Sequence, residues 1–238
     1  MNTCDLEALL RENAYPGRGI VLGRSADGRS AVMVYFIMGR SVNSRNRVFL
    51  PTEDGIRSEA YDPAKLADPS LILYHPVRVW RGHTIVTNGD QTDTVRDYLC
   101  AGKSFEAALR TRTFEPDAPN YTPRISGLVL PDGRYALSIL KPAGGDARCC
   151  TRQLFEYDAP LAGAGHFLHT YMSDGAPLPA FAGEPKCVGL NAATAAELAG
   201  RVWDALDEGN RVSLFVRYLE LETGEADTVI RNKNGEEA

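Results

Sequence analysis

The chain has 238 residues, of which 44% are hydrophobic and 24% are charged. This composition excludes disordered and fibrous proteins, and the chain is long enough to bury a sizeable core. The formal net charge of -5 at pH 7 excludes a surface that is basic throughout, so small anionic ligands fit better than nucleic acids.

The cysteines and the N-terminal residues indicate where the protein works. The five cysteines form no C-x-x-C pair, and their odd number and irregular spacing favour reduced thiols. The first residues lack the basic start and apolar centre of a signal peptide. No apolar run approaches the ~20 residues that a membrane helix needs. We therefore expect a cytoplasmic protein that contacts no membrane.

The first elements are a short helix and a hairpin. Three leucines at helical spacing behind Asp5 predict a helix within residues 1–14. Apolar strands are predicted at 20–23 and 31–38, and the turn residues Asp27-Gly28 between them favour a hairpin.

A polar stretch at residues 39–47, G-R-S-V-N-S-R-N-R, directly follows this hairpin. It carries three arginines, two asparagines and two serines, a set of donors that suits an anion such as a nucleotide phosphate. A solvated hairpin tip explains the same residues equally well. The hairpin, however, places Arg18 and Arg40 at the same end, which favours a binding cleft.

The next part alternates between polar and apolar pieces. We predict that a strand continues at 47–51, that 52–69 form a loop, and that 71–76 and 77–79 are apolar pieces around Tyr74. A turn at Arg81 and Gly82 then leads into a strand at 83–87.

The stretch N-G-D-Q-T-D-T at residues 88–94 ends that strand. Thr92 or Asp93 is expected to cap a helix over 95–100, which would turn backbone N–H groups toward a ligand. Its aspartates would repel phosphate, so we expect Asn88, Thr92 and Asp93 to contact a ribose or a base. Simple helix capping accounts for these residues equally well.

A helix is predicted at 105–112, followed by a proline-rich segment at 114–125. Its three prolines exclude a helix or a central strand, so the segment is expected to form a rigid loop. The loop would present Glu115 close to arginines, which makes this carboxylate a candidate proton carrier. A surface loop with salt bridges is the competing interpretation.

The second half is predicted to add strands, one long helix and a tail. Strands are expected at 126–130 and 135–140, and the Gly-rich residues 142–145 are expected to break the chain after the second of these. Further strands are expected at 150–157, in part of 161–171, and at 211–220 as the final strand; a loop is expected at 173–186, a helix at 192–207, and a frayed tail at 232–238. His166 and His169 form an H-x-x-H pair without further ligands, so we expect structural roles for them rather than a metal site.

Roughly ten strands against three or four helices favour an α+β fold with two sheets and helices outside them. No linker, repeat or low-complexity segment is evident, so a single domain over residues 1–238 is the simplest organisation.

Four motifs then carry a resemblance in one order along the chain: Y-P-G-R-G-I-V-L-G at 15–23, the arginine-rich stretch at 39–47, N-G-D-Q-T-D-T at 88–94, and N-Y-T-P-R-I at 120–125. Together they resemble the archaeal-type IMP cyclohydrolase family. The resemblance implies a four-layer αββα sandwich like that of the Ntn hydrolases, with residues 1–14 as an N-terminal extension helix. It also implies ring closure of 5-formamidoimidazole-4-carboxamide ribonucleotide to IMP, the last step of de novo purine biosynthesis.

The family's motif residues fall on Arg47, Tyr74 and Glu115. For this chemistry we expect Glu115 and Tyr74 to move protons and Arg47 to stabilise charge on the formyl oxygen. The reaction has no redox or metal step, so no cofactor is expected. Contacts to the purine ribonucleotide are expected from Arg18, Arg40, Ser41, Asn46, Asn88, Thr92, Asp93 and Arg124.

Two other functions stay open at this point. One is a purine-nucleotide sensor that keeps the cleft without turnover. The other is an Ntn-like amide hydrolase that uses Cys4 after trimming, although Met1 at the start makes autoprocessing unexpected. Whether the chain forms a homo-oligomer is also open.

Overall fold

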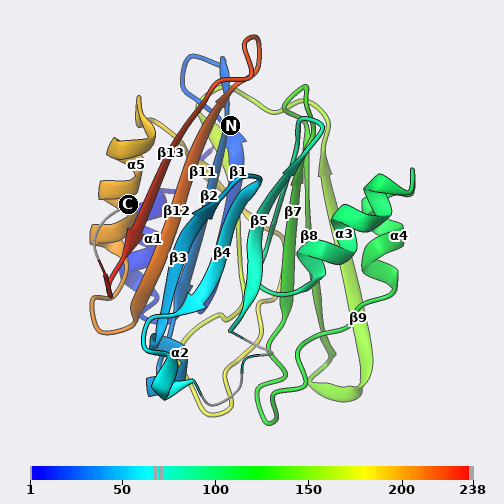
Figure 1. The fold of residues 1–238 in the computed structure, drawn as a ribbon, viewed down its shortest axis with the longest axis vertical. Coiled ribbons are helices and arrows are strands. Elements are labelled where there is room, and N and C mark those ends of the chain that lie inside the picture. The colour runs from blue at the N-terminus through cyan, green and yellow to red at the C-terminus, as the bar shows by residue number, and fades with distance from the viewer. Residues whose placement is uncertain (1, 67–68, 70–71, 236–238) are drawn as a thin grey trace.

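The computed structural model describes the chain except residues 1, 67–68, 70–71 and 236–238 (Figure 1). Its helices are α1 (Leu6–Glu12), α2 (Val42–Arg45), α3 (Gln91–Cys100), α4 (Phe105–Arg110) and α5 (Ala195–Ala205), with a 3-10 turn at Pro63–Lys65. No helix in this part of the chain combines the length and apolar character that crossing a bilayer demands.

The strands form two antiparallel sheets. The first is six-stranded, in the order β11 (Lys186–Gly189), β10 (Ala164–His169), β1 (Arg18–Arg24), β2 (Ser30–Met38), β12 (Arg211–Glu220) and β13 (Ala226–Asn232). The second is seven-stranded and runs in sequence order: β3 (Arg47–Thr52), β4 (Gly55–Ala60), β5 (Tyr74–Trp80), β6 (His83–Thr87), β7 (Arg124–Val129), β8 (Tyr135–Ala143) and β9 (Asp146–Tyr157).

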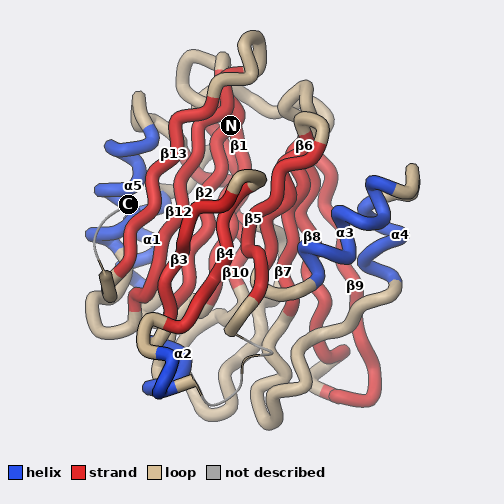
Figure 2. Tube along the Cα trace, in the orientation of Figure 1, coloured by secondary structure: helices blue, strands red, loops and turns tan. Residues whose placement is uncertain are grey.

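The two sheets pack face to face, and helices cover their outer faces (Figure 2). Helices α1 and α5 lie on the first sheet and share one hydrophobic cluster with it. Helices α3 and α4 lie on the second sheet and share another. A third cluster, between the sheets, joins residues such as Leu22 of β1 to Ile125 of β7. The order of layers is therefore helix, sheet, sheet, helix, which gives an α+β sandwich.

Strand β2 shows why the central strands are almost continuously apolar. Side chains alternate across a strand, so Val34 and Phe36 point to the helix layer while Met33 and Tyr35 point to the second sheet. Because both faces are buried, both sets are hydrophobic. In β2 the polar residue Ser30 therefore lies at the start of the strand.

The hairpin prediction is confirmed. Strands β1 and β2 pair in register, with Arg18 opposite Ile37, and the turn passes through Gly28 at a φ of 75°. Arg18 and Arg40 therefore lie at the same end of the sandwich. Asp5 caps α1 as predicted, accepting a hydrogen bond of 3.0 Å from the backbone N–H of Ala8.

Three predictions about elements were wrong. The expected loop at 52–69 contains strand β4, whose outward residues Arg57 and Glu59 form an ion pair at 2.9 Å and hide the strand pattern. Strand β13 follows the strand expected to be last, and Pro142 lies within β8 rather than breaking it. Residues 67–68 and 71 of the expected loop and apolar piece lie outside the described residues.

Two element boundaries also differ from the predictions. Helix α3 begins at Gln91, and Asp90 at its N-cap makes no side-chain capping bond, so Thr92 and Asp93 lie inside the helix instead of capping it. The tail is not frayed up to residue 235, because β13 ends at Asn232 and Asn234 donates a hydrogen bond of 2.8 Å to the carbonyl of Arg45. Residues 236–238 lie outside the described part.

Candidate active site

A polar cavity of about 270 Å³ opens at the end of the sandwich near α2, at the bottom of Figure 1. It lies where β1 and β3 begin, just past the ends of β2 and β10. It is lined by Tyr15, Arg18, Arg40, Ser41, Asn43, Ser44, Arg47, Ile72, Glu115, Asp117, Asn120, Thr122, Tyr171 and Leu178. The loops of both sheets thus contribute to one site.

Arg18 and Arg47 form the inner cationic part of this cavity. Arg47 is the first residue of β3 and is only 1% exposed, and its Nε donates a hydrogen bond of 3.0 Å to the carbonyl of Ser44. Arg18 is the first residue of β1, and its buried Nε has no hydrogen-bond partner among the described residues. A buried donor without a partner is costly. An anionic guest in the cavity would satisfy it.

The two guanidinium groups affect each other. Burial lowers the pKa of Arg47, and the neighbouring charge of Arg18 lowers it further. Burial also disfavours the charge on Arg18, but Tyr15 and Glu115 leave its pKa above the ordinary value. Both groups stay charged near neutral pH because the ordinary pKa of arginine is so high. The cavity therefore holds two close positive charges.

Glu115 supplies the acidic group of the site. It lies in the loop between α4 and β7 and is only 5% exposed. Burial raises its pKa to about 7, against the opposite effects of Arg18 and Arg124. A carboxyl group with a pKa near neutrality both takes up and releases a proton under physiological conditions. Such shifts are concentrated at functional sites.

Tyr74 lies close to these groups but does not line the cavity. It begins β5 and is buried, and its hydroxyl is 3.0 Å from the hydroxyl of Tyr35 on β2. Its electrostatic effect reaches both Arg18 and Arg47. Burial raises the pKa of Tyr35 well above its ordinary value, so the Tyr35 hydroxyl keeps its proton and fixes the position of Tyr74.

Arg40 and Ser41 line the more open part of the cavity. Arg40 pairs with Asp174 and donates a hydrogen bond of 2.9 Å to the carbonyl of Gly175, while its guanidinium lies 5.0 Å from the centre of the Tyr15 ring. Ser41 is the N-cap of α2 and exchanges hydrogen bonds with Ser44. These interactions hold the arginine-rich stretch in a defined shape beside the buried cations.

Comparison with known proteins places the chain in one family. A family model described as IMP cyclohydrolase-like protein matches residues 15–224. The chain belongs to the IMP cyclohydrolase-like protein family. Among curated proteins, it is 27% identical over 201 residues to a protein named IMP cyclohydrolase from Halobacterium salinarum, covering 82% of this chain and 87% of that protein. It is 29% identical over 146 residues to the IMP cyclohydrolase of Methanopyrus kandleri, covering 56% of this chain and 71% of that protein.

Of the site residues that were expected from the sequence, the structure brings Arg18, Arg40, Ser41, Arg47 and Glu115 to one cavity. The sequence analysis did not select several further lining residues. Thr122 could have been noticed because it lies in the N-Y-T-P-R-I motif. Tyr171 gave no signal, since only the pairing of β10 with β1 brings it here.

Three other residues that were expected to contact a substrate bind other parts of the protein in this structure. Asn46 bonds the backbone of Asp62 through both ends of its amide, at 2.8 Å each. The hydroxyl of Thr92 lies 2.6 Å from that of Thr87. Arg124 pairs with Asp90 at 2.8 Å and donates to Gln91 at 2.6 Å, although it is close enough to Glu115 to lower its pKa.

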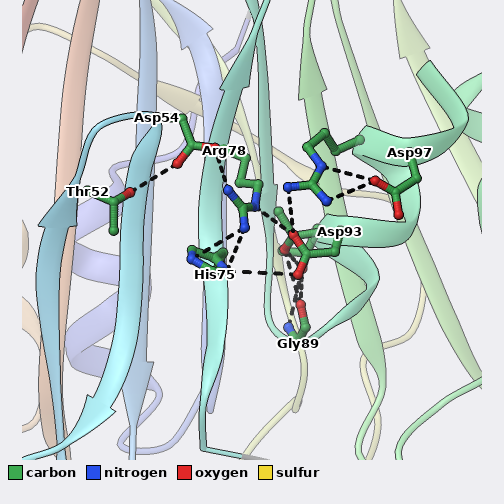
Figure 3. A network of polar contacts seen from close by, with 10 residues as sticks. Thr52, Asp54, His75, Arg78, Gly89, Asp93 and Asp97 are labelled. Atoms are coloured by element: carbon green, nitrogen blue, oxygen red, sulfur yellow. Dashed lines mark hydrogen bonds and ion pairs between the residues drawn. The ribbon is translucent and has the colours of Figure 1, made fainter. Parts of the chain in front are cut away.

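Asp93 does not line the cavity; it lies on α3 and takes part in a network of polar contacts with β5 (Figure 3). It accepts a hydrogen bond of 2.6 Å from Nε of Arg78, which also binds Asp54 and lies 3.0 Å from His75. This network joins α3 to β5 next to Tyr74. In this structure Asp93 is paired with Arg78, and a contact from it to a substrate stays a prediction.

Asn88 ties the end of β6 to the start of β7. Its amide donates to the carbonyl of Pro123 at 2.9 Å and accepts from the N–H of Ile125 at 2.9 Å, and the residue is buried. Asn88→Ala is therefore expected to lower the free energy of unfolding by about 2–3 kcal/mol, since it leaves both backbone groups unpaired. Urea denaturation measures this loss. A KM unchanged within about twofold in the folded variant would separate this role from substrate contact, whereas a large rise in KM with unchanged stability would contradict it.

Cys4 and the two histidines of the H-x-x-H pair lie elsewhere. The backbone of Cys4 bridges to the edge strand β11, and Cys4 does not line the cavity. His166 stacks on Tyr157 with ring centres 3.7 Å apart, and His169 packs against Phe181. No metal-binding group of three or more His, Cys, Asp or Glu occurs among the described residues. Met1 lies outside these residues.

Proposed function

We propose that the protein is an IMP cyclohydrolase that closes 5-formamidoimidazole-4-carboxamide ribonucleotide to IMP with loss of water. The observation that carries this proposal is that Arg18, Arg47 and Glu115 line one cavity, where Arg47 and Glu115 are buried and the buried Nε of Arg18 has no partner among the described residues. The family membership supports it. A ribonucleotide carries a negatively charged phosphate, and its formyl oxygen gains negative charge during closure. The substrate therefore supplies the negative charge that can pair with Arg18 and Arg47.

The reaction is intramolecular, and its first requirement is geometric. The carboxamide nitrogen must meet the formyl carbon, and holding reacting groups together in this way supplies a large part of an acceleration. The C–N bond forms, and the formyl C=O becomes a C–O⁻ group. Arg47, with fixed donors in a buried site, is the proposed stabiliser of that oxyanion.

Two protons must then leave with the formyl oxygen as water, one from the carboxamide nitrogen and one from the formamide nitrogen. Glu115 is the proposed carrier of the first, because a pKa of about 7 lets it accept the proton from nitrogen and return it to oxygen. Tyr74, with its hydroxyl held by Tyr35 at 3.0 Å, is the proposed second proton carrier. No step in this scheme needs a cofactor.

We further propose that the layered α+β fold is of the Ntn-hydrolase type. The activity of an Ntn hydrolase depends on a nucleophile in the active site. The edge position of Cys4, outside the cavity, favours cyclisation over amide hydrolysis.

The direct test mixes purified protein with the formylated ribonucleotide and follows IMP formation by ultraviolet absorbance and mass spectrometry. We expect turnover without added metal, and a matched reaction without protein gives the uncatalysed rate. Binding of IMP by calorimetry without any acceleration would overturn the enzymatic proposal and favour a sensor. Absence of both binding and turnover would overturn the assignment of the cavity.

A further inference from the structure

The loop that carries Glu115 is closed on itself by one neighbouring carboxylate. At its base, the N–H of Glu115 donates a hydrogen bond of 2.9 Å to the carbonyl of Thr122. Asp117 adds a second closure, because its Oδ1 accepts from the N–H of Thr122 at 2.6 Å and its Oδ2 accepts from the Thr122 hydroxyl. Two of these three bonds depend on the side chain of Asp117.

The direction of these hydrogen bonds is set by chemistry. An ionised carboxylate only accepts, so the Thr122 hydroxyl donates its single proton to Asp117. The hydroxyl of Tyr171, 2.5 Å from that of Thr122, must therefore be the donor to Thr122. Tyr171 lies just past β10 of the first sheet and stacks on Tyr15 with ring centres 6.0 Å apart. This series of hydrogen bonds thus attaches the Glu115 loop to the first sheet.

The charges around Glu115 come from several elements. Arg18 on β1, Arg47 on β3 and Arg124 on β7 favour its ionised form, whereas burial and Asp117 favour the protonated form. Tyr171, past β10, also faces this group. Among the charges that act on Glu115, Asp117 opposes the three arginines.

We propose that Asp117 is a positioning residue for Glu115: it holds the loop closed through Thr122 and Tyr171, and its charge keeps Glu115 able to carry a proton among three arginines. The kinetic part of this inference rests on the proposed cyclohydrolase function, but the effect on Glu115 itself does not. Asp117 would act on the reaction through Glu115 and need not touch the substrate.

An asparagine at position 117 separates the two roles. The amide oxygen of Asp117→Asn still accepts from the N–H of Thr122, and the amide NH₂ donates to the Thr122 hydroxyl, which is then free to donate to Tyr171. The loop keeps its closure while the negative charge is lost. Asp117→Ala removes both the bonds and the charge.

The test titrates Glu115 by the ¹³C shift of its side-chain carboxyl, assigned by its absence in Glu115→Gln. We expect a midpoint of about 7 in the wild type and a midpoint lower by about 0.5–1 pH unit in Asp117→Asn, because a like charge has been removed. The matched control is Asp27→Asn. Asp27 also accepts from a hydroxyl and a backbone N–H, those of Ser25 and Arg29, but lies in the β1–β2 turn away from the cavity. Asp27→Asn should leave the titration midpoint of Glu115 unchanged.

Kinetics provide the second readout. Asp117→Ala is expected to lower kcat by about 10–100-fold with little change in KM, because Glu115 is displaced while the substrate contacts remain. Asp117→Asn should keep kcat at its optimum within about threefold and shift the Glu115 limb of the pH profile to lower pH. Thr122→Ser should retain the activity that Thr122→Val loses.

The outcomes are distinguishable. A Glu115 midpoint that does not move in Asp117→Asn, or an unchanged kcat in Asp117→Ala, would overturn the inference. If Asp117→Ala does not fold, Asp117→Asn and the two Thr122 variants still test the inference. Should the wild type show no turnover while the midpoint shifts as expected, the proposed function fails and the role of Asp117 in setting the state of Glu115 stands.

Discussion

Glu115→Gln is expected to lower kcat for ring closure by about 10²–10⁴-fold, the usual contribution of a positioned acid or base. The amide has nearly the shape of the carboxyl group but cannot carry a proton, so IMP binding should change by no more than a few-fold. Absorbance kinetics and calorimetry measure the two effects. Full activity in this variant would remove Glu115 from the mechanism, and a loss of binding equal to the loss of kcat would make it a substrate contact instead.

The same variant is expected to change how stability depends on pH. Glu115 has an ordinary pKa of 4.5 and a pKa of about 7 in the folded protein. Between these values the folded state holds a proton that the unfolded state has lost. The free energy of unfolding should therefore fall as pH rises through this window, by on the order of 3 kcal/mol. Urea denaturation from pH 4.5 to pH 8 should show this contribution in the wild type and not in Glu115→Gln.

Arg47→Met is expected to lower kcat by about 10²–10³-fold, because it removes fixed donors aimed at a developing oxyanion. Arg47→Lys should recover only part of the rate, since an ammonium group has no planar fork of donors. Stability should behave differently. Burial disfavours the charge on Arg47, so replacing it by an apolar side chain of similar size is expected to cost no more than ~1 kcal/mol.

Arg211→Met is the matched control for this prediction. Arg211 is half-buried, donates a hydrogen bond of 2.6 Å to the carbonyl of Trp203 and lies 4.7 Å from the centre of its ring, but it does not line the cavity. This variant should be less stable with an unchanged kcat. If Arg47→Met unfolds the protein while Arg211→Met does not, Arg47 is a structural residue and its catalytic assignment is wrong.

The sequence alone allowed the prediction of elements whose pattern is local. Strands β1, β2 and β6 were predicted because their apolar runs are bounded by turn residues, and the Asp27-Gly28 pair marked their hairpin. Strand β4 was missed because one of its faces carries the Arg57–Glu59 ion pair, which gives it the composition of a loop. Residue propensities carry no information on the pairing of β4 with β3 and β5, which lie on either side of it.

The residues of the candidate site also differ in how far the sequence could predict them. The resemblance named Arg47 and Glu115, and the hairpin geometry placed Arg18 near Arg40. The polar motif at 88–94 gave no such guidance, because Asn88 has the same sequence appearance whether it binds a ribose or the backbone of Ile125. Tyr171 and Thr122 are 49 residues apart, and only the assembled sheets bring them together.

Arg18 and Arg47 come from different sheets. Arg18 opens a strand of the first sheet and Arg47 opens a strand of the second. The distance between their backbones thus depends on the thickness of the apolar layer between the sheets, where Leu22 and Ile125 pack. Residues deep in this layer do not line the cavity, yet substitutions that change their size are expected to alter how well the site fits the proposed nucleotide.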